Sequence, residues 1–433
     1  MITQSIRTGF FLLLLLLTGV LPESQAQMTS STRVIGIDLL KSRGETVIPF
    51  DLEQGFIIVD VWLGGFVPMK MIFDTGAENI ILFDREIPIL LGIPFERQIP
   101  VMGSDLDSVI MANIARNVML RAEGCNQVLR DIIVLEENNL LLKEKLGIEV
   151  NGILGGGFFP NVVVKIDYRR KQITLRHPNK FKKPKGKYHE FDLEIRSNKP
   201  YLQAGLKVSD QRDSATSVRL LLDTGAALPF LIHANTDSTL TLPDSIMLGN
   251  VGFGLGGVIR GYMGRSRELD FSPFVYSNIA TSFQDLNFGS GPRPKLIRNG
   301  ILGNNLLSRF YIVIDYSREK LYLQASKKYN RDFEFDKSGI TVFAVGSKLD
   351  KYYIVSVLEG SPAAEADVQP GDLIIKVNRR RSSNMRLQDI TNMFSKKPGK
   401  SIKLTLIRGE EKIKREFVLR EWTQVSDSST TPK

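Results

Sequence analysis

Two aspartates of this chain stand in the same tetrapeptide, Asp74-Thr75-Gly76-Ala77 and Asp223-Thr224-Gly225-Ala226. Each copy lies between two runs of apolar residues, which predicts a strand, a tight turn that presents the carboxylate, and a second strand. Two carboxyl groups that lie close together cannot both ionise easily, so they share a proton. The sequence therefore predicts a carboxyl pair that is suited to general acid–base chemistry.

The residues after each aspartate have separate tasks in such a pair. Thr75 and Thr224 can hydrogen-bond the backbone of the opposite loop and hold the two loops rigid. Gly76 and Gly225 let the backbone approach the opposite loop closely and donate to a carboxylate.

The alanines that follow, Ala77 and Ala226, place no hydroxyl beside the carboxyl groups. A missing donor removes stabilisation of the ionised form, so the pKa values of the pair should be raised. This predicts activity at weakly acidic to neutral pH.

A second repeated element lies at the same distance from each aspartate to within one residue. It reads Asn151-Gly152-Ile153-Leu154-Gly155 in the first half and Asn299-Gly300-Ile301-Leu302-Gly303 in the second. Residues 151–175 and 299–323 align without a gap and share Ile-Asp-Tyr further on. The chain therefore contains two copies of one unit, which suggests a pseudo-two-fold pair of lobes.

These motifs resemble the retropepsin branch of the aspartic proteases over roughly residues 45–325, with the viral pattern especially similar at 301–307. The resemblance implies an all-β, bilobal pepsin/retropepsin-like fold. It implies an aspartic endopeptidase in which Asp74 and Asp223 activate a water that attacks a peptide bond. It implies no metal or organic cofactor, a polypeptide substrate, and a site for which a monomer is sufficient.

The resemblance also implies a flap in each lobe, a hairpin that closes over the substrate. The candidate hairpins are 100–111 and 252–264, and the glycines of the second suit a mobile hairpin. The predicted tip residues are Gly103 and Ser104 in the first flap and Gly256 and Gly257 in the second. The alternative is that both stretches are ordinary turns.

The sequence changes character after residue 335. Gly360-Ser361-Pro362 and Pro370-Gly371-Asp372 lie between predicted strands, and this part closely resembles a PDZ domain of bacterial secreted proteases. The resemblance implies a peptide groove between the strand from Ile340 and a helix over 385–394. Ser338, Gly339 and Ile340 would hold the terminal carboxylate of a peptide ligand. The alternative is a unit that only packs against the lobes.

The N-terminus has the features of an export signal. Arg7 precedes an apolar run over 10–20, and Ser24-Gln25-Ala26 matches a small-x-small cleavage site. This predicts an exported protein, periplasmic or secreted, without a stable membrane span after cleavage. The alternative is a membrane anchor, for which the run is short.

Composition limits the remaining classes of function. Cys125 is the only cysteine, so no intrachain disulfide can form, and three scattered histidines argue against a zinc site. The net charge is +10, but no recognition motif accompanies it, so no nucleic-acid partner is expected.

The predicted organisation is a signal peptide over 1–26, a first lobe over 27–180, a second lobe over 181–330, a PDZ domain over 336–422 and a disordered tail over 423–433. The predicted function is an aspartic endopeptidase whose PDZ domain recognises peptide or regulates access. The main alternative is a non-catalytic exported protein that binds or senses peptide. A glycosidase fits poorly, since nothing else in the sequence supports sugar binding.

Overall fold

A computed structural model describes residues 36–136, 142–209, 214–243, 246–285, 296–333 and 336–420. The predicted signal peptide (1–26) and tail (423–433) lie outside the described residues. Strands dominate the described part of the chain, which confirms the prediction of a mostly β protein.

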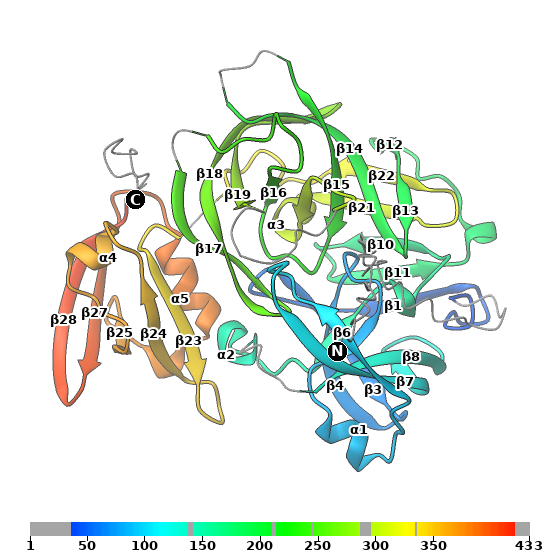
Figure 1. The fold of residues 1–433 in the computed structure, drawn as a ribbon, viewed down its shortest axis with the longest axis horizontal. Helices are drawn as coiled ribbons and strands as arrows, with labels where there is room; N and C mark the ends of the chain where they lie inside the picture. Colours follow the sequence, from blue (N-terminus) through cyan, green and yellow to red (C-terminus); the bar gives the residue numbers. More distant parts are fainter. Residues whose placement is uncertain are drawn as a thin grey trace, which may run out of the picture. The chain divides into compact units, whose positions relative to one another are not determined.

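The two sequence repeats form two eight-stranded sheets (Figure 1). The first contains, in order, β2 (Asp51–Glu53), β3 (Phe56–Leu63), β4 (Val67–Phe73), β9 (Gly152–Leu154), β5 (Ile80–Leu82), β8 (Val128–Leu135), β7 (Val109–Ala122) and β6 (Arg97–Met102). The second contains β13 (Glu194–Arg196), β14 (Lys199–Lys207), β15 (Thr216–Asp223), β20 (Gly300–Gly303), β16 (Phe230–Ala234), β19 (Phe274–Asp285), β18 (Gly257–Phe271) and β17 (Ile246–Gly254). The strand order is the same in both, so the duplication in sequence is also a duplication in structure.

The apolar runs before the two aspartates are β4 and β15, and each lies inside its sheet. β4 pairs with β3 and, in parallel, with β9, while β15 pairs in the same way with β14 and β20. Residues 71–73 and 220–222 are buried, as expected for strands that are covered on both faces.

A third sheet joins the lobes. Its order is β1 (Glu45–Pro49), β11 (Gln172–Arg176), β10 (Val163–Asp167), β21 (Phe310–Asp315), β22 (Lys320–Ala325) and β12 (His189–Asp192). β10 of the first repeat pairs antiparallel with β21 of the second, with Lys165 opposite Val313. One hydrophobic core contains residues from both lobes, so the lobes form one folded body.

The C-terminal part folds around its own sheet and its own core. The sheet order is β23 (Ile340–Val345), β24 (Lys351–Val357), β25 (Leu373–Val377), β27 (Ser401–Arg408) and β28 (Glu411–Val418), with β26 (Arg380–Arg381) beside β25. The helices of this part are α4 (Pro362–Glu365), a 3-10 turn (Ser382–Asn384) and α5 (Leu387–Phe394). In the described part of the chain, β23 is an edge strand of this sheet.

The helix predicted over 385–394 begins later than the sequence indicates. It begins at Leu387, because the Asp389 carboxylate accepts the Arg386 N–H at 3.0 Å and caps the helix there. In the first repeat, Leu135 pairs with Ala112 in the sheet, and a short helix, α2 (Leu142–Leu146), follows, with residues 137–141 outside the described part.

The remaining helices are short: α1 (Glu86–Leu90), α3 (Asn304–Leu307) and two 3-10 turns (Gly156–Phe158 and Pro178–Lys180). Within the ranges that the structure describes, no helix has the length and apolar character needed to cross a bilayer.

Candidate functional site

The structure brings Asp74 and Asp223 together, one at the end of β4 and the other at the end of β15. Their carboxyl groups hydrogen-bond each other. Gly76 N–H donates to Asp74 Oδ1 at 2.6 Å, and Gly225 N–H donates to Asp223 Oδ1 at 2.8 Å. The two loops therefore hold the carboxyl groups in equivalent positions on either side of a pseudo-two-fold axis.

The two threonines lock these loops to each other. Thr75 N–H donates to Thr224 Oγ1 at 3.0 Å, and Thr224 N–H donates to Thr75 Oγ1 at 3.1 Å. The Thr75 hydroxyl donates to the Leu222 carbonyl at 2.7 Å, and the Thr224 hydroxyl donates to the Phe73 carbonyl at 2.8 Å. Both threonines are buried, so water does not compete for these four hydrogen bonds.

The surroundings of the two carboxyl groups raise both of their pKa values. Burial raises the pKa of Asp223 well above its ordinary value, and the neighbouring Asp74 charge and its hydrogen bond add to the rise. Burial also raises the pKa of Asp74, but the hydrogen bond from Asp223 and the N–H groups of Gly76, Ala77 and Gly225 oppose that rise. Both pKa values are raised, so the pair retains one proton that the two carboxyl groups share. The pair therefore offers one proton donor and one acceptor side by side.

Aromatic rings lie beside the pair. Phe73 stacks on Phe159 with ring centroids 4.7 Å apart, and Phe159 meets the ring of Tyr316 edge-on at 6.0 Å. The Tyr316 hydroxyl is buried and has no hydrogen-bond partner. Its pKa is raised by burial and by the charge of Asp74. Tyr316 is therefore part of the apolar surround that desolvates the pair.

Tyr168, the equivalent of Tyr316 in the first repeat, has a hydrogen-bond partner. The Tyr168 hydroxyl donates to Asn304 Oδ1 at 2.5 Å, and Asn304 Nδ2 donates to the Gly55 carbonyl at 2.7 Å. In the first repeat, Gly156 stands where the second has Asn304, so Tyr316 lacks a matching amide. No role for Tyr168 and Tyr316 was predicted from the sequence, although the repeated Ile-Asp-Tyr was a signal that both tyrosines belong near the site.

The predicted flap residues lie at the tips of two hairpins. Gly103 and Ser104 follow β6, while Gly256 lies in the turn between β17 and β18 and Gly257 is the first residue of β18. Gly256 and Gly257 have φ values of +98° and +105°, a backbone conformation that favours glycine.

The two tips touch each other. Ser104 N–H donates to the Leu255 carbonyl, and Gln284 Nε2 donates to the Asp105 carbonyl at 3.0 Å. The role of these hairpins as flaps stays a prediction.

The three predicted PDZ residues form a loop that already binds a carboxylate of this chain. Asp336 Oδ1 accepts the Ser338 N–H at 3.0 Å and the Gly339 N–H at 2.6 Å. Ile340 N–H donates to Ser338 Oγ at 3.1 Å. The loop therefore has the geometry of an anion-binding nest, filled by a side chain two residues upstream.

Burial raises the pKa of Asp336 from 3.8 to about 6, which makes the stability of this loop pH-dependent. The folded chain binds this proton more tightly than the unfolded chain, so the contribution to stability is complete below pH 3.8 and is lost as the pH rises through 6. We expect Asp336→Asn to remove this pH-dependent loss of stability, which amounts to about 1–3 kcal/mol in the free energy of unfolding. Thermal unfolding at about pH 5 and about pH 7.5 measures it, with the exposed Asp350→Asn as a control. An equal pH dependence in the wild type and in Asp336→Asn would contradict this assignment.

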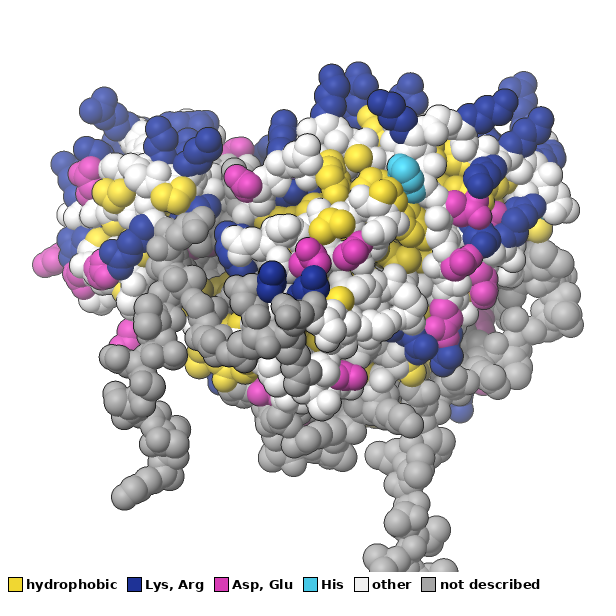
Figure 2. Space-filling model, turned by 90° about the horizontal axis from the view of Figure 1, so that it is seen from above, with side chains coloured by type: hydrophobic (Ala, Val, Ile, Leu, Met, Phe, Trp, Pro, Cys, Tyr) yellow, Lys and Arg dark blue, Asp and Glu magenta, His cyan; other side chains and the backbone are white. Residues whose placement is uncertain are grey.

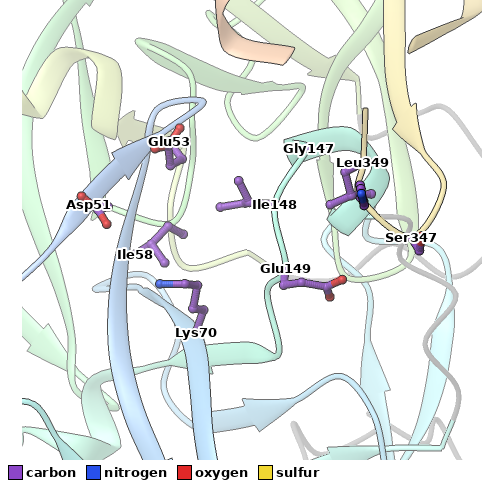
Figure 3. Close-up of a pocket in the computed structure, with 10 residues that line it drawn as sticks. Asp51, Glu53, Ile58, Lys70, Gly147, Ile148, Glu149, Ser347 and Leu349 are labelled. Atoms are coloured by element: carbon purple, nitrogen blue, oxygen red, sulfur yellow. The ribbon is translucent and has the colours of Figure 1, made fainter. Parts of the chain in front are cut away.

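The structure also contains a cavity of about 390 Å³ that is separate from the aspartate pair. Figure 3 shows Asp51, Glu53 and Lys70 on one side of it and Glu149 and Ser347 on the other. Both signs of charge line it, and among the described residues no cluster of histidine, cysteine and acidic side chains could hold a metal.

On the face shown in Figure 2, Lys and Arg side chains lie at several separate places along the upper margin, with acidic side chains and hydrophobic groups between them. The basic side chains of this face therefore do not gather into one patch.

Comparisons with known proteins identify the C-terminal unit. The PDZ domain model matches residues 353–408, which confirms the predicted PDZ domain. Curated relatives from Staphylococcus aureus strains COL, N315 and MRSA252, each named as a probable CtpA-like serine protease, are 32% identical over 104 residues. The match covers 23% of this chain and 21% of each relative. The chain thus matches about a fifth of the length of these relatives.

These comparisons overturn the predicted catalytic type. The relatives are named as serine proteases, and no comparison supports an aspartic protease of the retropepsin type. The prediction of an aspartic endopeptidase that activates water with Asp74 and Asp223 is therefore wrong by this finding, whereas the PDZ part of that prediction agrees with it. What the comparisons show of this chain is a PDZ domain at residues 353–408, in a protein with a distant likeness to proteases.

Proposed function

We propose that this chain is a peptidase that binds polypeptides, with Asp74 and Asp223 as the ionisable groups of its site and the PDZ domain as a peptide-binding unit. The observation that carries the proposal is the buried carboxyl pair, which holds one proton between two loops locked by Thr75 and Thr224. The protease names of the relatives and the PDZ match support the choice of polypeptide as substrate.

The pair is suited to a peptide carbonyl because it holds a proton that it can donate to the carbonyl oxygen. This hydrogen bond gains strength from the low dielectric of a buried site. Side chains with strongly perturbed pKa values cluster at functional sites, which supports the choice of this pair.

The fold is part of the proposal. We propose the bilobal arrangement known from acid proteases, supported by the identical strand order of the two eight-stranded sheets and by the sheet that joins them. Fold alone does not set the catalytic type, because similar folds carry different chemistry.

We also propose that the chain is exported and that its units follow the boundaries 1–26, 27–180, 181–330, 336–422 and 423–433. The support for export is the N-terminal sequence with Arg7, the apolar run over 10–20 and the small residues Ser24 and Ala26. Fractionation of cells that express the full chain tests this, since an exported protein should lose its N-terminal segment and leave the cytoplasm.

The test of the site is hydrolysis of casein by purified residues 27–433 at weakly acidic to neutral pH. Asp74→Asn and Asp223→Asn should each lower kcat/KM for casein at least about tenfold, because each removes a charged hydrogen-bonding group from the proposed binding site, and such a hydrogen bond is worth about 1.5–3 kcal/mol. Asp192→Asn, an exposed aspartate of the second lobe, is the matched control and should keep the wild-type rate.

A fluorophosphonate probe, which labels activated serines, completes the assay because the relatives are named as serine proteases. Full activity in both Asp variants together with a labelled serine would place the site away from the pair. Peptide binding without hydrolysis at any pH would assign the chain to the peptide-binding class instead.

A further inference from the structure

The groove of the PDZ unit is bounded by β23 and α5. PDZ domains add a peptide as a strand at such an edge and place its side chains between the strand and the helix. Ile340, Val342 and Ala344 of β23 are buried, as are Leu387 and Ile390 of α5, so the groove is apolar. Lys337 N–H donates to the Phe394 carbonyl at 3.0 Å, which closes the groove at the end of the carboxylate loop.

A segment of the first lobe lies on this groove. α2 packs against β23, and its residues Leu142 and Leu146 are buried. The next residue, Gly147, lies between the two walls: a methyl group built on it would lie 2.9 Å from Leu387 Cβ and 3.6 Å from Ala344 Cβ. Figure 3 shows Gly147 beside Leu349 of the PDZ unit.

α5 of the PDZ unit also contacts the first lobe. Gln54 N–H, in the turn between β2 and β3, donates to Gln388 Oε1 at 2.6 Å. Arg386 Nη1 lies 3.2 Å from Glu53 Oε1, in an ion pair just before α5 begins. The first lobe thus contacts both the groove and the start of the helix that forms one of its walls.

The other end of the groove is filled as well. The amides of Ser338 and Gly339, which would receive the terminal carboxylate of a peptide, already donate to the Asp336 carboxylate. Charged acceptors on backbone N–H groups make strong hydrogen bonds, so a ligand carboxylate must displace Asp336 to bind there.

We propose that the PDZ groove is self-occupied, with α2 and Gly147 of the first lobe covering the end at Leu387 and the Asp336 carboxylate filling the end at Gly339. Peptide binding to the PDZ unit and docking of α2 on β23 then exclude each other. This inference rests on the proposed function of the PDZ unit in peptide binding. If the groove is self-occupied, a peptide ligand that binds in it displaces α2 of the first lobe from the PDZ unit.

Competition of this kind lowers the apparent affinity in proportion to the fraction of molecules whose groove is open. Locking α2 on β23 should therefore nearly abolish binding, and loosening it should strengthen binding. A disulfide can provide the lock, since the Cβ separation of 3.6 Å between positions 147 and 344 lies within the range of disulfides.

The experiment uses the full chain with Gly147→Cys and Ala344→Cys in a Cys125→Ala background. The probe is a fluorescein-labelled decapeptide that ends in Leu-Val-Val with a free carboxylate, and its binding is followed by fluorescence polarisation. The oxidised protein should bind it at least about tenfold more weakly than the same protein after reduction. The Gly147→Cys single variant controls for the replacement of a glycine at φ +69° and should not respond to reduction.

The outcomes separate this inference from the function on which it rests. Equal affinity of the reduced form and of the oxidised form with its disulfide made would show that α2 does not block the groove. This result overturns the inference and leaves peptide binding in place. No binding by the reduced protein or by Asp336→Ala would overturn the peptide-binding function itself, and the inference with it.

Asp336→Ala tests the other end of the groove. It frees the amides of Ser338 and Gly339 and should raise the affinity for the free-carboxylate probe several-fold, with no gain for the same peptide ending in an amide. An equal gain for both probes would show that Asp336 does not compete with the terminal carboxylate.

Discussion

Replacing Thr224 with Val is expected to lower the free energy of unfolding of the two lobes by about 3–5 kcal/mol, one of the largest effects of any single substitution in this chain. The hydroxyl makes one hydrogen bond as donor to the Phe73 carbonyl and one as acceptor from the Thr75 N–H. Val keeps the shape but leaves both of these buried backbone groups without partners. Each unpaired group costs about 1–3 kcal/mol.

Urea unfolding followed by the fluorescence of Trp62 measures this loss, in a Trp422→Phe background that removes the other tryptophan. Thr224→Ser keeps the hydroxyl and should recover most of the stability. A Val variant as stable as the Ser variant would show that the hydrogen bonds between the loops contribute little to holding the lobes together.

Replacing Gly225 with Ala is expected to reduce peptide hydrolysis at least about 100-fold, because misplacing groups that position a substrate by about 1 Å can have an effect of that size. A methyl group at this position would overlap the carboxyl carbon and both oxygens of Asp74. The opposite glycine, Gly76, stands in the same relation to Asp223. Either alanine must push the two carboxyl groups apart, and the proton can then no longer be shared.

The pH profile distinguishes this effect from unfolding. Separation of the carboxyl groups removes the neighbouring charge that raises the pKa of Asp223, so residual activity should shift to lower pH. Gly205→Ala is the control, because a methyl group there makes only ordinary contacts, with Ala215 Cβ at 3.4 Å and with Asp270 O and Cβ at 3.8 and 3.9 Å. An unchanged rate and profile in Gly225→Ala would mean that the pair is not part of the working site.

The features that local sequence determines were predictable. The strands before Asp74 and Asp223 follow from apolar runs, and the turns follow from Thr-Gly after each aspartate. The PDZ unit was predictable from Gly360-Ser361-Pro362 and from Pro370-Gly371-Asp372, since these turn signals fix the spacing of its strands.

The contacts between distant residues were not predictable. Tyr168 meets Asn304 across 136 residues of sequence, and Gly147 meets Leu387 across a domain boundary. No periodicity or motif predicts contacts between residues so far apart in the sequence, because these contacts form only when separate elements pack against each other. The catalytic type was predicted from the two Asp-Thr-Gly-Ala motifs and the repeated Asn-Gly-Ile-Leu-Gly element, and it was overturned by the comparisons, so motifs and their geometry do not by themselves determine a mechanism.

The strand pairing between the lobes has a consequence for how such a chain could arise. Lys165 and Val313 occupy the same position in the two repeats and lie opposite each other, so β10 and β21 pair about a two-fold axis. A pairing of equivalent strands is the interface of a symmetric dimer. Residues 182–187 between the repeats are mostly exposed, and they act as a tether that raises the effective concentration of one half near the other. The chain therefore has the symmetry of a dimer within one polypeptide, and the tether allows the two halves to differ in sequence. The second repeat has Asn304 where the first has Gly156, and α2 of the first repeat packs against β23.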